Sequence, residues 1–113
     1  MKIEKFHVYS ADLNPRFGTE PGKVRPVVVI QTDLLNPHHP STVVCPLTTR
    51  VVHEASVLRV HLPKGEAGLL RASDILVDQI RAVDNRRLVK RIGKIRTSYQ
   101  TKLLENLRIL LFE

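Results

Sequence analysis

Short apolar runs, broken every few residues by proline, glycine, asparagine or aspartate, are the feature that most constrains the fold of this chain. Residues 27–30 and 42–45 are each the length of one strand and are rich in β-branched side chains. Such runs, bounded by turn-forming residues, are typical of strands in a small barrel or sandwich. Residues 57–62 alternate between polar and apolar side chains from Arg59 to Leu62, which indicates a strand with one solvated face. We therefore expect a mainly β domain.

Proline and turn residues set the expected ends of these strands. We expect a first strand over residues 5–11, a turn at residues 12–15 and a long loop over residues 16–24. Pro26 is expected at the very beginning of the next strand, because a proline inside a strand leaves one position without a hydrogen-bond donor. Its ring also holds the preceding residue, Arg25, in an extended backbone. Pro46 is expected to close the strand of residues 42–45.

The C-terminal segment has the spacing of a helix. Leucines recur there at helical intervals, at Leu103, Leu104, Leu107, Leu110 and Leu111. Thr97 and Gln100 have the spacing of a capping box, which predicts the beginning of the helix. Upstream, residues 69–83 are expected to be extended, and Asp84 is placed to cap a short turn at residues 85–88. The expected architecture is mainly β, with a C-terminal α-helix packed on the sheet.

Length and composition indicate one domain. The 113 residues, 42% of them apolar, suffice for a single core over residues 1–113. The lone Cys45 cannot form an internal disulfide, and the sequence begins without an apolar signal segment, so we expect a cytoplasmic location. No apolar run approaches the ~18 residues that span a bilayer, so no membrane contact is expected.

Positive charge is concentrated in the second half of the chain. Residues 1–56 hold 6 basic and 5 acidic residues, whereas residues 57–113 hold 12 basic and 6 acidic residues. A basic field of this kind attracts polyanions such as nucleic acid. An acidic protein partner or an ordinary solvated face fits it as well. Only 4% of the residues are aromatic, which disfavours a sheet paved with rings for stacking on RNA bases.

The sequence lacks the usual signatures of catalysis and metal binding. It has no CxxC pair, no histidines at zinc spacing, no P-loop, no GxSxG and no GxGxxG. We therefore expect neither a metal site nor a cofactor. Polar residues remain beside the expected strand ends, namely Arg25, Thr48, Thr49, Ser73, Asp74, Asp78, Gln79 and Arg81. Each of them alone also fits an ordinary role, such as an ion pair for Arg25 or a strand cap for Thr48.

Three motifs give these residues a context. GKVRPVVVIQ occupies residues 22–31, PLT occupies residues 46–48 and DQIR occupies residues 78–81. In this order and spacing they resemble the MazF/PemK family of toxin endoribonucleases. The likeness covers nearly the whole chain, since residues 9–15, 18–20 and 87–93 match as well. The chain departs from the family pattern modestly, at Thr19, Cys45 and Ala82.

The resemblance implies a compact SH3-like β-barrel that forms a symmetric homodimer. It also implies sequence-specific, metal-independent cleavage of single-stranded RNA, in particular messenger RNA, with Arg25 and Thr48 in the active site. The implied partner is a cognate antitoxin with an acidic, disordered tail. Contact with DNA is implied only through a complex with that antitoxin.

Such a reaction needs no metal ion because RNA carries its own nucleophile, the 2′-hydroxyl group. The guanidinium group of Arg25 suits the stabilisation of charge at the attacked phosphate, since it can donate two hydrogen bonds and stays charged. Thr48 can donate to the same oxygens. The proton transfers are open: the resemblance assigns them to Arg25, whereas His61, on the solvated face of its strand, is a rival. The expected products are a 2′,3′-cyclic phosphate and a 5′-hydroxyl group.

Further residues are expected to contact the RNA. We expect residues 16–24 to form a gate, with one ring to stack on a base and polar groups for sugar, base edge and phosphate. Gln79 and Arg81 could hydrogen-bond to unstacked bases from the facing strand, or simply lie exposed on it. The predicted RNA-binding residues are Phe17, Thr19, Glu20, Lys23, Thr49, Gln79 and Arg81.

Two other functions compete with this hypothesis. A related group of toxins with the same fold inhibits DNA gyrase without catalysis, but that activity does not require a phosphate-binding arginine and threonine. The other alternative is an inactive barrel that only binds RNA. In that case the wild-type protein and an Arg25→Ala variant would be equally inactive.

Overall fold

The computed structural model describes residues 1–15, 17–19 and 23–113. Its strands are β1 (His7–Asp12), β2 (Val24–Val29), β3 (Ser41–Thr48), β4 (Arg59–Leu62), β5 (Ser73–Leu76), β6 (Arg81–Asp84) and β7 (Leu88–Lys94). Its helices are the short 3₁₀ helices η1 (Glu66–Gly68), η2 (Val77–Gln79) and η3 (Asn85–Arg87), and the α-helix α1 (Thr97–Phe112). The predicted mainly β architecture with a C-terminal helix is confirmed.

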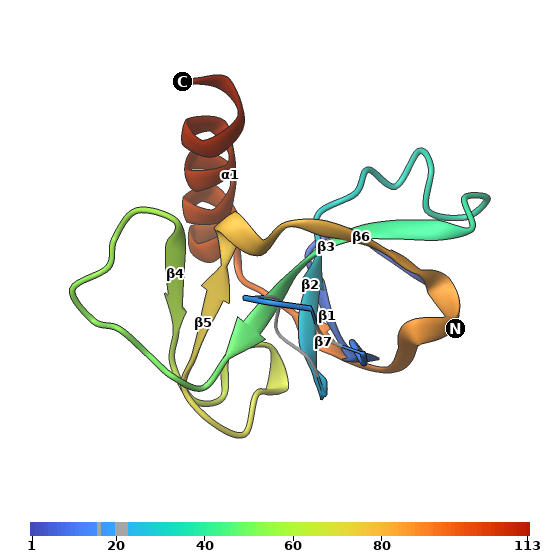
Figure 1. Ribbon diagram of the computed structural model, residues 1–113, viewed down its shortest axis with the longest axis horizontal. Helices are drawn as coiled ribbons and strands as arrows, with labels where there is room; N and C mark the ends of the chain where they lie inside the picture. Colours follow the sequence, from blue (N-terminus) through green and yellow to red (C-terminus); the bar gives the residue numbers. More distant parts are fainter. Residues whose placement is uncertain (16, 20–22) are drawn as a thin grey trace.

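The strands form one curved antiparallel sheet in the order β4-β5-β3-β2-β1-β7 (Figure 1). β3 runs through its centre, and the edge of β3 that faces away from β2 pairs with β6 along Ser41–Val44 and with β5 at Leu47 and Thr48. The two ends of this order, β4 and β7, do not pair with each other. The sheet is therefore not closed into a complete barrel by hydrogen bonds.

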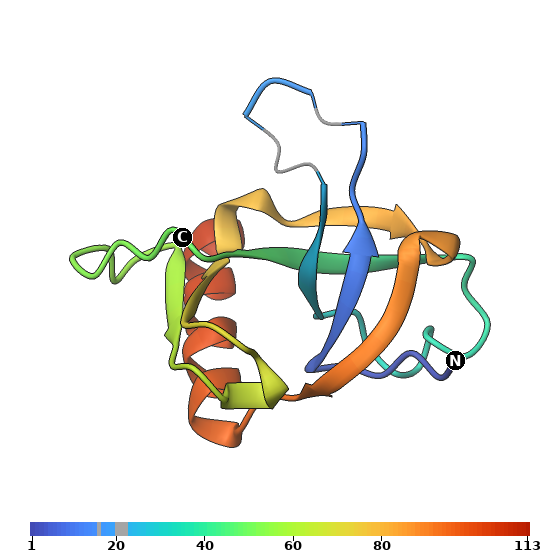
Figure 2. The same cartoon turned by 90° about the horizontal axis from the view of Figure 1, so that it is seen from below.

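Packing takes the place of hydrogen bonding across this gap. η1, which follows β4, lies against β7 (Figure 2). The two backbones approach so closely that a Cβ atom on Gly93 would lie 2.5 Å from the carbonyl oxygen of Ala67. Glu66 extends the contact, since its buried carboxylate accepts hydrogen bonds from the backbone N–H and the Nε atom of Arg96 at 2.8 and 2.7 Å.

The sheet carries an apolar core on each face because side chains alternate along its strands. On the first face, Val28, Cys45 and Leu47 pack with the buried Leu103 and Leu107 of α1. On the second face the buried residues are Tyr9, Ala11, Leu13, Val27, Val29, Val44, Val83 and Leu88. The strand residues that carry the candidate site continue along this second face.

The strands predicted over residues 5–11 and 57–62 begin two residues later than expected, at His7 and Arg59. Two other predicted boundaries are wrong at prolines. β2 begins at Val24, so Pro26 is its third residue, and β3 continues through Pro46 to Thr48. The register between β2 and β3 begins at Val27↔Pro46. Pro26 lies before that point, where β2 pairs with β1 through Ser10. Its missing N–H group therefore removes no bond of the β2–β3 ladder, and the strand tolerates the ring.

The helix was predicted correctly, but its cap was not. α1 begins at Thr97, and Arg96 is the capping residue, with no hydrogen bond from its side chain to the helix. Gln100 instead donates from Nε2 to the carbonyl oxygen of Ile95 at 2.8 Å.

Among the described residues, no helix combines the length and the apolar character that crossing a membrane requires.

The segment that follows β4 is less regular than expected. Residues 69–83 do not form one extended element, because η2 separates β5 from β6. The turn after Asp84 is confirmed: the carboxylate of Asp84 accepts from the backbone N–H of Arg86 at 2.8 Å and caps η3.

Candidate active site

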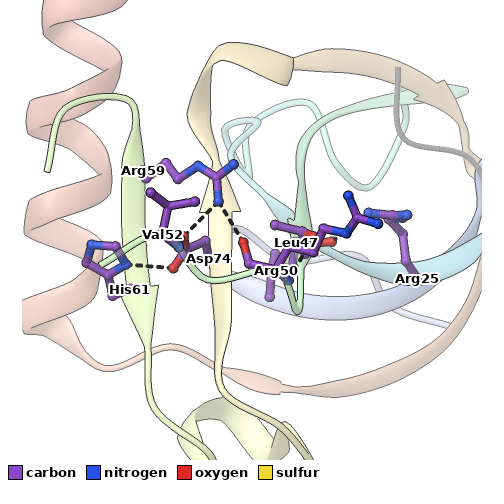
Figure 3. Close-up of polar contacts among 8 residues, drawn as sticks. Arg25, Leu47, Arg50, Val52, Arg59, His61 and Asp74 are labelled. Atoms are coloured by element: carbon purple, nitrogen blue, oxygen red, sulfur yellow. Dashed lines mark hydrogen bonds and ion pairs between the residues drawn. The ribbon is translucent and has the colours of Figure 1, made fainter. Parts of the chain in front are cut away.

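Arg25 and Thr48 lie on neighbouring strands at the same end of the sheet. At this end of the sheet, the last pair of the β2–β3 register is Val27↔Pro46. Arg25 lies two residues before Val27 and Thr48 two residues after Pro46, so each shares a face with its end of that pair. Residues that face each other in an antiparallel pair project from the same face. The Nη1 atom of Arg25 donates a hydrogen bond to the carbonyl oxygen of Leu47 at 3.3 Å (Figure 3). The guanidinium group therefore reaches the backbone immediately beside Thr48.

The hydroxyl group of Thr48 is held by the turn that follows β3. Its Oγ1 atom accepts a hydrogen bond from the backbone N–H of Arg50 at 3.2 Å. A hydroxyl group has one donor hydrogen besides its acceptor sites, and this bond uses only an acceptor site. The hydrogen of Thr48 thus remains available for donation to a bound group.

A buried carboxylate lies directly across from this hydroxyl group. Asp74 of β5 is opposite Thr48 in the β3–β5 register, and its side chain is 0% exposed. Its Oδ2 atom accepts from the backbone N–H of Val52 at 3.0 Å and from Nη1 of Arg59 at 2.8 Å. Its Oδ1 atom lies 2.6 Å from Nδ1 of His61. Both carboxylate oxygens are therefore satisfied by donors.

These contacts keep Asp74 ionised. Burial is the largest single influence and would raise its pKa, but the hydrogen bonds from Val52, Arg59 and His61 together outweigh it. The pKa of Asp74 consequently lies below its ordinary value of 3.8. Because an ionised carboxylate can only accept, the Nδ1 atom of His61 carries the hydrogen in this contact.

His61 completes a row of side chains that crosses four strands. It is opposite Asp74 in the β4–β5 register, so Arg25, Thr48, Asp74 and His61 follow one another from β2 to β4. We call these four residues the polar row. Figure 3 shows Arg25 and His61 at its opposite ends, with Asp74 between them. His61, the predicted rival for proton transfer, is therefore separated from Arg25 by two intervening strands.

Arg59 connects this row to the loop that follows Thr48. Its Nη1 atom donates to Asp74 and also to the carbonyl oxygen of Arg50 at 2.9 Å. Together with the bond from Val52 to Asp74, this ties the start of the loop over residues 49–58 to β4 and β5.

The predicted base-reading residues lie in η2 and at the beginning of β6, the strand that pairs with the first half of β3. Arg81 begins β6 opposite Val44. It lies on the same face as Thr48, because Thr48 is four positions after Val44 and alternate residues of a strand share a face. Its Nη1 atom is buried and has no hydrogen-bond partner within the part of the chain that the structure describes. Gln79 is half-buried in η2, directly before β6.

The predicted gate residues extend from the other side of Arg25. Phe17 is 70% exposed, and Thr19 and Lys23 are exposed as well. The backbone N–H of Lys23 donates to Oδ1 of Asn14 at 2.8 Å, which holds the base of this segment beside the beginning of β2. Glu20, the remaining predicted contact in this loop, lies outside the described residues.

Thr49, by contrast, lines a groove on the opposite side of the strand ends. The groove has a volume of about 500 Å³ and lies between β7, η1 and the beginning of β2. Arg71, Lys90 and Arg91 are its basic residues, and Pro26, Leu69, Leu70 and Ile92 contribute apolar surface. We call it the basic groove. Pro26 and Thr49 are the chain neighbours of Arg25 and Thr48, so the groove and the polar row meet at these strand ends.

Across residues 1–15, 17–19 and 23–113, no group of three or more histidine, cysteine, aspartate or glutamate side chains is arranged to hold a metal ion. Cys45 is fully buried on the first face of the sheet. Burial, with a smaller contribution from the charge of Asp78, raises the pKa of its thiol to about 12. Cys45 therefore fills the core as an uncharged side chain.

Sequence reasoning missed the bonds that connect Asp74, Arg59 and Arg50. Two signals were present in the sequence. One is an aspartate within the segment SDIL, which forms the mostly buried strand β5, and the other is the pair Arg59 and His61 on one face of its strand. What could not be obtained from the sequence is the register that brings β4 and β5 beside Thr48.

The fold and this arrangement of residues define a small toxin of the MazF type. The family of PemK-like, MazF-like toxins of type II toxin-antitoxin systems matches residues 4–111. A relative from Bacillus subtilis (strain 168), Endoribonuclease EndoA, is 36% identical over 109 residues, covering 96% of this chain and 94% of the relative. The chain therefore belongs to this family of toxins, which includes endoribonucleases, as the sequence motifs predicted.

Solved structures have the same fold. MazF from Deinococcus radiodurans superposes with a TM-score of 0.85 at 22% identity, covering 100% of this chain and 99% of that chain. A MazE-MazF complex from the same organism gives a TM-score of 0.78 at 21% identity, covering 98% of this chain and 97% of that chain. The Mycobacterium tuberculosis toxin MazF-mt6 gives 0.75 at 24% identity, covering 91% of this chain and 93% of that chain.

Proposed function

We propose that this protein is a sequence-specific endoribonuclease that cleaves single-stranded RNA without a metal ion, with Arg25 and Thr48 as its catalytic residues. One observation carries the proposal: the Arg25 guanidinium group donates to the carbonyl oxygen of Leu47, so it lies at the backbone beside the Thr48 hydroxyl group. A phosphate bound there would meet a fixed cation and a free hydroxyl hydrogen together. Family membership and the EndoA relative support the same conclusion.

The chemistry follows from these two donors. The 2′-oxygen of the substrate attacks the adjacent phosphorus, the bond from phosphorus to the 5′-oxygen breaks, and a 2′,3′-cyclic phosphate forms. The 2′-hydroxyl group loses a proton and the leaving 5′-oxygen gains one. Arg25 and Thr48 stabilise the negative charge that develops on the phosphate oxygens between these events, and fixed donors of this kind typically contribute about 100-fold to 1,000-fold in rate.

We assign the proton transfers to Arg25 or to water held by it, in preference to His61. His61 has its Nδ1 atom committed to Asp74 and lies at the far end of the polar row. Histidine is the side chain that ordinarily titrates between about pH 5.5 and 7.5. A cleavage rate that stays constant over this pH range supports the assignment, whereas a bell-shaped profile would assign the protons to histidine.

The RNA-binding surface is proposed to extend on both sides of the scissile phosphate. Arg81 and Gln79 would contact bases. The Nη1 atom of Arg81 is buried and lacks a partner among the described residues, so it can donate to a bound base. Phe17, Thr19, Glu20 and Lys23 would contact the strand from the loop, with Phe17 free to stack because it is largely exposed. Thr49 would contact RNA at the edge of the basic groove, whose cations suit phosphates.

The regulatory partner is proposed to be a cognate antitoxin whose acidic, disordered tail covers this basic surface. The formal charge of +7 favours such a tail, and MazE-MazF complexes are among the structures with this fold. The active form is proposed to be a cytoplasmic homodimer that contacts DNA only when bound to the antitoxin.

Incubation of the purified protein with single-stranded RNA in EDTA tests the catalytic proposal. We expect fragments that end in a 2′,3′-cyclic phosphate and a 5′-hydroxyl group, and no cleavage of the all-deoxy strand, which lacks the nucleophile. Cleavage of the deoxy strand would contradict the mechanism. Binding without cleavage would support the inactive-barrel alternative, and inhibition of gyrase with no effect on RNA would support the other.

A further inference from the structure

We infer that Asp74 is a positioning residue for the Thr48 hydroxyl group. The inference rests on the proposed function, because it gives Asp74 a role in that reaction without contact to the RNA. It follows from where the bonds of Asp74 and Arg59 end. They end on the backbone of Arg50 and Val52, in the turn whose Arg50 N–H group holds the hydroxyl group in place.

The connection is short and continuous. The backbone N–H of Arg50 donates to Oγ1 of Thr48 at 3.2 Å. The carbonyl oxygen of the same residue accepts from Nη1 of Arg59 at 2.9 Å, and that nitrogen donates to Asp74 at 2.8 Å. Asp74 also accepts from the backbone N–H of Val52 at 3.0 Å. The turn after Thr48 is thus fixed at Arg50 and at Val52 by one carboxylate.

The burial of Asp74 makes this anchor rigid. Its side chain is fully covered, whereas its partners Arg59 and His61 are 25% and 37% exposed. A buried carboxylate needs hydrogen-bond donors to its oxygen atoms. Conformations of the loop in which these hydrogen bonds are broken are therefore strongly disfavoured. Arg50 and Val52, in contrast, are exposed residues of a loop. Without the anchor, their backbone would be restrained by the bond from Arg50 to Thr48 and by bonds within the loop itself, such as that from the N–H of Ala55 to the carbonyl oxygen of Val52.

An ordinary structural role does not account for where these bonds lead. β4 and β5 already pair through four registered positions, from Arg59↔Leu76 to Leu62↔Ser73, and β5 pairs with β3 at Leu47 and Thr48. The bonds of Asp74 to the loop add nothing to these ladders. Their effect is on the turn, and therefore on the direction in which Thr48 presents its hydrogen.

The primary test measures kcat and KM for single-stranded RNA cleavage by Asp74→Asn. Asparagine keeps the size of the side chain but removes the negative charge that strengthens the bond from Arg59. Its single oxygen atom also cannot accept all three hydrogen bonds. We expect kcat to fall by about 10-fold to 100-fold, the scale associated with small misplacements of catalytic groups, while KM changes little. Asp84→Asn is the matched control, since Asp84 also binds an arginine but lies on the surface at η3, and it should cleave like the wild type.

A double-mutant cycle distinguishes positioning from general weakening. In a Thr48→Val background the hydroxyl group is gone, so Asp74→Asn should reduce kcat by less than about 2-fold further. If the two reductions simply multiply, the inference is overturned. Amide hydrogen exchange provides a readout without RNA: in Asp74→Asn the amides of Arg50 and Val52 should exchange faster, while those of β2 and β3 keep their protection.

The outcomes separate the inference from the proposed function. A wild-type protein that leaves RNA intact overturns the proposed function and the inference with it. A wild-type protein that cleaves RNA, with Asp74→Asn cleaving equally well, overturns the inference alone. Where Asp74→Asn does not fold, Arg59→Gln replaces it, since that change removes the link to Arg50 and leaves Val52 and His61 bound to Asp74. It should also lower kcat, and again only while Thr48 is present.

Discussion

The guanidinium group of Arg25 donates a hydrogen bond, 3.3 Å long, to the carbonyl oxygen of Leu47. Leu47 is the residue immediately before Thr48. Arg25 on β2 thereby contacts the backbone of β3 directly beside the Thr48 hydroxyl group. Two residues that are 23 positions apart in sequence are brought to one place by the antiparallel pairing of two strands. The charge and the hydroxyl group are held by sheet backbone, which is more rigid than a loop.

Replacing Arg25 tests whether its charge or its shape matters. Arg25→Ala should reduce single-turnover cleavage by about 100-fold to 1,000-fold, because it removes a fixed donor to the phosphate oxygens. Arg25→Lys should recover only a small part, since an ammonium group cannot donate two parallel hydrogen bonds from one plane. Arg108→Ala, on the exposed side of α1, is the control. Full activity in Arg25→Lys would show that charge alone suffices.

Thr48 should tolerate loss of its methyl group but not of its hydroxyl group. Thr48→Ser keeps the oxygen that accepts from Arg50, and we expect its kcat to stay within about 3-fold of the wild type. Thr48→Val has the same shape without the donor and should lose roughly 100-fold. The measurement is kcat for a defined RNA oligonucleotide. Equal activity of the serine and valine variants would remove Thr48 from the reaction.

Asp74 should make the stability of the protein sensitive to acid. Its pKa in the folded protein lies below 3.8, so its hydrogen bonds stabilise the fold fully above that ordinary value and are lost as the pH falls through the lower, folded value. At pH 7 we expect Asp74→Asn to lower the free energy of unfolding by about 1.5 to 3 kcal/mol. Denaturant titrations at several pH values should show this difference shrinking below about pH 4. A difference independent of pH would contradict the assignment.

The sequence predicted those features that depend on neighbours along the chain. The alternation of residues 57–62 predicted β4, which begins at Arg59, and the leucine spacing predicted α1. The family motifs indicated Arg25 and Thr48 as a pair. The start of β2 was predicted wrongly at Pro26, because the cost of a proline in a strand depends on whether its missing N–H group would face a partner strand. That information comes from the register Val27↔Pro46, which is a tertiary property.

The polar row shows the same limit at the candidate site. Asp74 and Arg59 stand 26 and 11 residues after Thr48, and nothing in their local sequence indicates that both bind the turn after it. Only the pairing of β4 with β5 and of β5 with β3 brings them there. Contacts of this kind depend on strand order, which the spacing of motifs does not reveal.

The contact of η1 with β7 should be intolerant of any side chain at Gly93. The Cβ atom of an alanine would lie 2.5 Å from the carbonyl oxygen of Ala67, so one backbone must move. We expect Gly93→Ala to lower the free energy of unfolding by about 1 to 3 kcal/mol, as measured by denaturant titration. Lys94→Ala, at the next and exposed position, should change it by less than about 0.5 kcal/mol. Equal effects of the two variants would show that the gap between η1 and β7 can widen freely.

The thiol of Cys45 should be inert in the folded protein. It is fully buried, and burial is the main reason that its pKa is raised to about 12. Only the thiolate reacts with alkylating agents, so at pH 8 the folded protein offers neither the reactive species nor access to it. We expect iodoacetamide to modify no thiol over hours under native conditions and one thiol after unfolding in guanidinium chloride. Because reaction then requires global opening, its rate should rise in Gly93→Ala in proportion to the unfolded fraction. Rapid modification of the wild-type protein would instead show that the sheet opens locally at β3, beside Thr48.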